Sequence, residues 1–150
     1  MRKNGDAYQT TEILFEKLKS FEGCRLQAYQ DAAKVWTIGY GHTKGVKKGD
    51  NITQVEAEAY LREDVEEVEG QILALNLNLT QPQFDALVSF VYNVGIGAFK
   101  ESTLLRFIRE GRSENDIKKQ FCSWVYSNGR TLPGLVKRRE WESIRFFSLF

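Results

Sequence analysis

Residues 23–52 interrupt a chain that is otherwise patterned as helix, and this interruption limits the possible folds more than any other feature. The segment concentrates glycine and β-branched residues, among them Gly23, Val35, Thr37, Ile38, Gly39, Gly41 and Gly45. Trp36–Tyr40 has the composition of a strand. We therefore predict a small sheet with tight turns, confined to the N-terminal part of an α+β chain.

Helical periodicity surrounds this segment. Before it, Leu14, Leu18 and Phe21 follow helical spacing after Thr10 and Thr11, either of which could cap the helix. After it, Thr53 and Glu56 have the spacing of a capping box. They precede one apolar stripe, made of Leu61, Val65, Val68, Ile72 and Leu75. The stripe predicts a long helix over residues 54–75.

The rest of the chain is predicted to be helical. Thr80 and Gln83 form a second capping box, with Pro82 in the first turn and a stop at Gly95. Further helices are predicted near 102–110, near 114–126 and from Gly134 to the end. Within one domain of residues 1–150, we expect a sheet lobe at about 22–53, a connecting helix at about 54–75, and a helical lobe. That lobe comprises residues 80–150 and the N-terminal helix.

Charge and composition exclude several classes of protein. Hydrophobic residues are 42% and charged residues 27%, as in globular proteins, and the net charge is only +1. Successive fifty-residue segments have charge balances of +3, −6 and +4. The basic first and last segments could bind an anionic polymer. The alternative is that the acidic middle segment is simply one solvated helix face. We expect no nucleic-acid partner and no membrane insertion, because no nucleic-acid motif and no apolar run of about 20 residues occurs.

The two cysteines, Cys24 and Cys122, have no Cys or His at metal-ligand spacing. We therefore expect no zinc site. Without a visible secretory signal, two free thiols made in a reducing cytoplasm are expected, and a bridge closing a long loop is the alternative.

Glu22 and Asp31 are the candidate carboxylates for chemistry. Cleavage of a glycosidic bond needs one protonated and one ionised carboxyl group. The negative end of the first helix disfavours ionisation of Glu22, whereas Asp31 lies in a polar loop. Taken alone, this spacing is weak, and a helix-end Glu with a turn Asp is the simpler interpretation.

The neighbouring residues change that balance, because four blocks resemble the phage-type lysozymes, the endolysin family of glycoside hydrolase family twenty-four. The first block comprises Phe21-Glu22-Gly23, Ala28–Asp31 and Trp36–Thr43. The others are Leu79–Leu87, Phe90–Gly95 with Ser102–Leu105, and Pro133–Glu140. The resemblance covers nearly the whole chain, in the family's order, and implies a lysozyme-like fold.

The resemblance also implies roles for particular residues. Glu22 would protonate the β-1,4 bond between N-acetylmuramic acid and N-acetylglucosamine, while Asp31 and Thr37 would position water, which implies inversion. Substrate would be bound by Gly41, Thr43, Tyr92 and Ser102. The family's usual glycine after the catalytic aspartate is missing from Ala32–Val35, so the turn there is expected to differ.

Two further expectations concern His42, which the same resemblance covers, and the two arginines that begin the last predicted helix. His42, the only histidine of the chain, matches a residue that pairs with an aspartate of the long helix, here Asp64. Either Arg138 or Arg139 is expected to approach Glu22, and the other could belong to a solvated basic face.

The leading hypothesis is a monomeric muramidase that needs no metal and no cofactor, acts on peptidoglycan and waits in the cytoplasm for a membrane pore. A non-catalytic wall-binding or structural module on the same fold is the alternative. A nucleic-acid-binding domain built on the basic C-terminal third is a third, weaker hypothesis.

Overall fold

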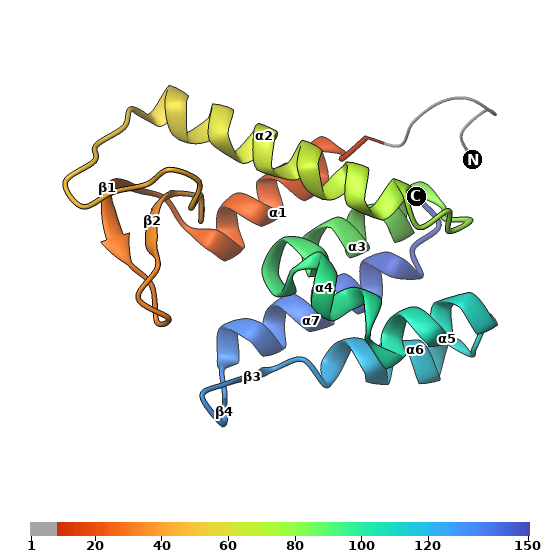
Figure 1. Ribbon diagram of the computed structural model, residues 1–150. Helices are drawn as coiled ribbons and strands as arrows, with labels where there is room; N and C mark the ends of the chain where they lie inside the picture. The colour runs from red at the N-terminus through yellow and green to blue at the C-terminus, as the bar shows by residue number, and fades with distance from the viewer. Residues whose placement is uncertain (1–8) are drawn as a thin grey trace. The chain divides into compact units, whose positions relative to one another are not determined.

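A computed structural model describes residues 9–150 (Figure 1). Its elements, in chain order, are α1 (Glu12–Glu22), β1 (Arg25–Gln30), β2 (Trp36–Gly39), α2 (Gln54–Leu73), α3 (Gln81–Val94), α4 (Ile96–Lys100), α5 (Thr103–Glu110), α6 (Glu114–Cys122), β3 (Tyr126–Ser127), β4 (Arg130–Thr131) and α7 (Pro133–Phe146). The α+β class predicted from the sequence is confirmed. The chain divides into a sheet unit, Glu12–Glu67, and a helical unit, residues 9–11 with Val68–Phe150.

The sheet unit contains an antiparallel pair, β1 and β2, in which Tyr29 faces Thr37 and Gln30 faces Trp36. The other edge of β1 is also paired, because the amide of Ala28 donates to Asp50 and that of Ile52 to Leu26, at 2.9 and 2.8 Å. Extended backbone near residues 50–52 therefore covers an edge that would otherwise be open.

The helix α1 belongs to the sheet unit, whereas the sequence analysis grouped it with the helical lobe. Two ion pairs connect it to α2 inside this unit: Lys19 with Glu58 at 3.1 Å, and Arg62 with Glu12 at 3.4 Å. Its apolar face, which includes Leu14 and Leu18, is fully buried.

The long helix α2 begins as predicted. The amide of Thr53 donates to the Glu56 carboxylate, and the amide of Glu56 donates to the Thr53 hydroxyl, both at 3.1 Å. Its buried stripe is Leu61, Val65, Val68 and Ile72. The helix ends at Leu73, before the predicted Leu75, and Asn76 then takes a left-handed conformation with φ 54°.

The helical unit is built around α3, which is buried along most of its length. Thr80 caps it with both hydrogen bonds of the predicted capping box, and Gly95, with φ 89°, ends it. The helix α7 packs against α3 and α6, and α5 packs against α6 (Figure 1). Fully buried aromatic rings of this unit are Phe84, Phe90, Phe99 and Phe121.

Two helices of this unit end earlier than predicted: the one expected from Gly134 to the end stops at Phe146, and the one expected over 114–126 ends at Cys122. A short hairpin, β3–β4, follows it. Asn128 and Gly129 connect the strands with φ of 53° and 76°. Two successive left-handed residues are the requirement of a tight two-residue hairpin turn, and asparagine followed by glycine meets it well.

Within residues 9–150, no helix combines the length and apolar character that a membrane crossing requires.

Candidate active site

Glu22 is the last residue of α1 and is half-buried. The helix stops there because Gly23 takes the left-handed conformation, φ 67°, while its amide still donates to the Lys19 carbonyl at 3.0 Å. Glycine tolerates this conformation without cost from a side chain. The chain then enters β1 directly, so Glu22 is fixed at the junction between helix and sheet.

Asp31 lies in the tight turn between β1 and β2. Its amide donates to the Val35 carbonyl and its carbonyl accepts from Lys34, both at 2.9 Å. One carboxylate oxygen, Oδ1, accepts from the amides of Ala33 and Val35, at 2.8 and 2.9 Å. No hydrogen bond from residues 9–150 reaches the other oxygen, which leaves it able to bind water or a ligand.

The turn closes without the family's glycine because Lys34 adopts the left-handed conformation in its place, with φ 64°. A residue with a side chain pays about 1–2 kcal/mol for this conformation. The turn at Ala32–Val35 thus closes around Asp31 with a left-handed lysine, which introduces local strain.

Thr37 is buried, with 4% of its surface exposed, and stands opposite Tyr29 in the sheet. Its hydroxyl donates to the Val35 carbonyl at 2.9 Å. Since a hydroxyl has one proton, Thr37 could only accept a hydrogen bond from a water molecule.

Tyr29 faces Thr37 in the sheet and is influenced by the charges of both candidate carboxylates, and sequence reasoning gave it no role. Burial raises the pKa of its phenol, Arg25 opposes that rise, and the negative charges of Glu22 and Asp31 add to it. Both carboxylates therefore act on one side chain, although nine residues separate them. The available signal was position alone, because Tyr29 lies on β1 two residues before Asp31, which follows the end of that strand.

Gly41 and Thr43 flank His42 at the end of a tight loop. Ile38 and His42 exchange two backbone hydrogen bonds of 2.9 Å around it, and Gly41 is left-handed with φ 85°. Thr43 is exposed. The structure thus brings Glu22, Asp31, Thr37, Gly41 and Thr43 into one unit.

The predicted pair of His42 and Asp64 is confirmed, with 2.8 Å between Nδ1 and the carboxylate. The imidazole also stacks on Tyr60 at 4.3 Å between ring centres. Burial raises the pKa of Asp64, and its hydrogen bond to His42 counteracts that rise.

The two other candidates for substrate binding, Tyr92 and Ser102, belong to the helical unit. Tyr92 is half-buried on α3. Ser102 is the N-cap of α5: its oxygen accepts from the Leu105 amide at 3.0 Å and its proton is donated to the Phe99 carbonyl at 2.7 Å. Its hydroxyl therefore has a structural task, and its substrate role stays a prediction.

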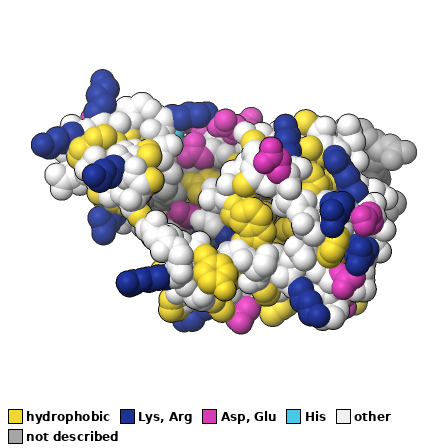
Figure 2. Space-filling view, turned by 60° about the horizontal axis from the view of Figure 1, so that its bottom comes forward, with side chains coloured by type: hydrophobic (Ala, Val, Ile, Leu, Met, Phe, Trp, Pro, Cys, Tyr) yellow, Lys and Arg dark blue, Asp and Glu magenta, His cyan; other side chains and the backbone are white. Residues whose placement is uncertain are grey.

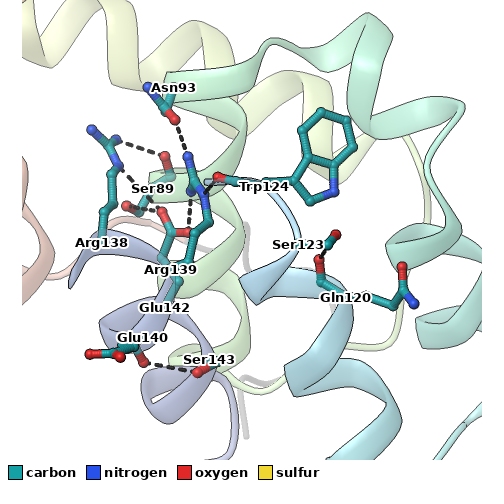
Figure 3. Close-up of polar contacts among 10 residues, drawn as sticks. All are labelled: Ser89, Asn93, Gln120, Ser123, Trp124, Arg138, Arg139, Glu140, Glu142 and Ser143. Carbon is teal, nitrogen blue, oxygen red and sulfur yellow. Dashed lines mark hydrogen bonds and ion pairs between the residues drawn. The ribbon is translucent and has the colours of Figure 1, made fainter. Parts of the chain in front are cut away.

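The solvated basic face expected for Arg138 or Arg139 is wrong, because both side chains are buried. Figure 3 shows them around Glu142. Arg138 donates to this carboxylate at 3.4 Å and to the Ser89 carbonyl at 2.8 Å. Arg139 also binds Glu142 and Asn93, and donates to the Trp124 carbonyl at 2.9 Å. Sequence reasoning missed Glu142, which lies one helical turn after the arginines.

Neither the surface charges nor the two thiols indicate a further functional site. Lys and Arg side chains are spread over the face in Figure 2 and do not form one basic patch. Cys24 and Cys122 are free thiols. Among residues 9–150, no three His, Cys, Asp or Glu side chains are grouped as metal ligands.

Comparison with known proteins supplies the context for this geometry. The phage lysozyme family model matches residues 19–142. An endolysin of Acyrthosiphon pisum secondary endosymbiont phage 1 is 44% identical over 136 residues, which cover 87% of this chain and 92% of that protein. An endolysin of Bacillus phage PZA is 47% identical over 144 residues, covering 93% of this chain and 55% of the longer phage protein.

A solved structure agrees with these matches. The muramidase domain of SpmX from Asticaccaulis excentricus is 38% identical, with a TM-score of 0.85 over 94% of this chain and 99% of that one. The α+β architecture described above is therefore lysozyme-like.

Proposed function

This chain belongs to the phage lysozyme family, and from that premise we propose that it is a muramidase. It would hydrolyse the β-1,4 bond between N-acetylmuramic acid and N-acetylglucosamine in peptidoglycan. Its endolysin relatives support a glycoside hydrolase of the lysozyme class.

The observation that carries the proposal is the arrangement around Tyr29. The negative charges of Glu22 and Asp31 both raise the pKa of this phenol, and Thr37 stands opposite it in the sheet. Glycosidic cleavage requires two carboxyl groups that converge on one bond, and this arrangement supports such a pair.

The two carboxylates would have different tasks. Glu22, half-buried at the end of α1, is assigned as the general acid that protonates the leaving oxygen. Asp31, through its free oxygen, would accept a proton from the attacking water. Thr37 would accept the second hydrogen of that water, because its own proton is already donated to Val35.

This assignment implies inversion at the anomeric carbon, because water attacks the sugar from the face opposite the leaving group. Substrate contacts are assigned to Gly41, Thr43, Tyr92 and Ser102. The protein would act as a monomer, without metal or cofactor. We further propose that it is made in the cytoplasm and reaches the wall through a membrane pore, because a folded, charged chain does not cross a bilayer unaided.

Replacing Glu22 by Gln tests the proposal. Glutamine keeps the shape of the side chain and has no proton of suitable acidity. The rate at which purified protein clears a cell-wall suspension should fall by at least about a hundredfold. Glu16→Gln, an exposed change on the same helix, is the matched control and should clear walls at the wild-type rate.

Two outcomes would oppose the proposal. Clearing by Glu22→Gln at more than about a hundredth of the wild-type rate would reject Glu22 as the acid. Wild-type protein that binds walls without releasing reducing sugar ends would favour the inactive wall-binding module.

A further inference from the structure

The sheet unit contains a pocket of about 190 Å³ that involves neither Glu22, Asp31 nor Thr37. Its polar lining comes from the loop after β2 and from the first half of α2: His42, Lys44, Asp50, Asn51, Glu56 and Tyr60. Sites for whole small molecules usually measure about 300–1,000 Å³. This pocket is therefore suited to one end of a ligand and is too small for a disaccharide.

The pocket is rich in oxygen atoms that can accept hydrogen bonds. Asp50 uses Oδ2 to accept from the Lys47 amide at 2.8 Å. Glu56 uses Oε1 to accept from Thr53. Residues 9–150 provide no hydrogen bond to the second oxygen of either carboxylate. The amide nitrogen of Asn51 donates to the Gly49 carbonyl at 3.0 Å, so its side-chain oxygen is also left to accept.

His42 adds an independent observation. Only 7% of this residue is exposed, and it lines the pocket. Its Nδ1 is bound to Asp64, yet within residues 9–150 no group is hydrogen-bonded to its Nε2. Its ring stacks on Tyr60 with 11° between the planes, so a rigid aromatic pair forms part of the lining.

The lining side chains that have no ion-pair partner within residues 9–150 carry a net negative charge. The ammonium of Lys44, the one cationic side chain in the lining, is bound to Glu67 outside the pocket. Asp50 and Glu56 have no cationic partner among the described residues. A phosphate or carboxylate ligand would therefore be repelled, whereas a cation would be attracted.

We propose that this pocket binds the primary ammonium group of a small ligand. An ammonium has three N–H donors, and the pocket offers Asp50, Asn51 and Glu56 as acceptors. Tyr60 adds to the lining an aromatic ring of the kind that binds cations. Two sources have this chemistry: the free amine of a diamino acid in a peptidoglycan stem peptide, and a free diamine. The site goes beyond the proposed function because binding there requires no catalysis.

Nuclear magnetic resonance of the His42 side chain tests the site directly, because the chain has only one histidine. The full chain is titrated with 1,5-diaminopentane, with Nα-acetyl-lysine and with Nα,Nε-diacetyl-lysine, at constant pH and ionic strength. The first two should shift the imidazole signals saturably, whereas the diacetylated compound should not. No saturable shift with either amine, or an equal shift with all three compounds, would overturn the proposal.

The source of the amine is distinguished by a fourth ligand, a muropeptide whose diamino acid has a free amine. Saturable binding of this muropeptide, lost when its amine is acetylated, assigns the stem peptide. Binding of diaminopentane without the muropeptide assigns a free diamine. Working in the Glu22→Gln protein keeps the ligand intact, and it lets this proposal and the muramidase assignment fail separately.

Two substitutions remove charge from the pocket and keep its local hydrogen bonds. Glu56→Gln retains a capping box with Thr53, and Asp50→Asn retains an acceptor for the Lys47 amide. Each should weaken diaminopentane binding about tenfold, because a charge-assisted hydrogen bond is lost. Glu66→Gln, an exposed change on α2 outside the lining, is the control. Wild-type affinity in both pocket variants would overturn the proposal.

Discussion

Asp31 and Glu142 are carboxylates held in opposite ways. Asp31 is exposed, and two backbone amides fix one oxygen while the other remains free. Glu142 is fully buried, and both of its oxygens are bound, by Ser89 and the two arginines. Burial raises the pKa of Glu142, and the charges of Arg139 and Arg138 oppose that rise. A carboxylate with a free oxygen can act on a ligand, whereas one whose two oxygens are both bound in the interior maintains the fold.

The largest effect should come from the buried carboxylate. Glu142→Gln keeps the side-chain shape and leaves two buried guanidiniums without their counter-charge. We expect the free energy of unfolding, measured with urea, to fall by about 3–5 kcal/mol. Glu140→Gln, its exposed neighbour on α7, should change stability by less than about 0.5 kcal/mol. A loss below about 1 kcal/mol for Glu142→Gln would contradict the stabilising role that distinguishes Glu142 from Asp31.

Ser102 is the next test, because two roles compete for one hydroxyl. As the N-cap of α5 it should contribute about 1 kcal/mol, which Ser102→Ala removes and Ser102→Asn retains. If the hydroxyl also binds substrate, both variants should raise KM in wall digestion. If only the alanine variant raises KM, the effect comes from loss of the helix cap, and the hydroxyl does not bind substrate.

The sequence was informative where local rules decide the structure. Both capping boxes, the buried stripe of α2 and the strand near Thr37 follow from short-range spacing, and all are confirmed. The pair of His42 and Asp64 came from resemblance, since no local rule connects residues 22 positions apart.

The features that the sequence did not predict have a different physical origin. Glu142 was given no role, and a solvated face was considered for one of Arg138 and Arg139, because charged residues are almost never fully buried without a partner. Their partners Ser89 and Asn93 come from α3, far away in the sequence. The hairpin after Cys122 was missed because a helix was predicted up to residue 126, although asparagine followed by glycine at 128–129 is a hairpin turn signal.

A smaller effect of opposite sign is expected at the turn that fixes Asp31. Lys34→Gly should relieve the left-handed strain, partly offset by the greater backbone entropy of glycine when unfolded, and stabilise the protein by about 0.5–1 kcal/mol. Ala33→Gly, in the same turn without a positive φ, should destabilise by about as much. Urea unfolding of both variants measures the difference, and equal signs would show that Lys34 carries no strain.

The smallest effect tests whether both candidate carboxylates act on one side chain. The negative charges of Glu22 and Asp31 raise the pKa of Tyr29, so neutralising either one should lower that pKa toward its ordinary value. The sign follows because a nearby negative charge disfavours the phenolate, and removing the charge makes ionisation easier. Carbon-13 signals of labelled tyrosine, with Tyr29→Phe for assignment, follow the titration in Glu22→Gln and Asp31→Asn. Glu16→Gln is again the control and should leave the Tyr29 titration unchanged. A lower Tyr29 pKa in only one of the two variants would show that only that carboxylate influences Tyr29. Tyr29 would then no longer support Glu22 and Asp31 as a catalytic pair.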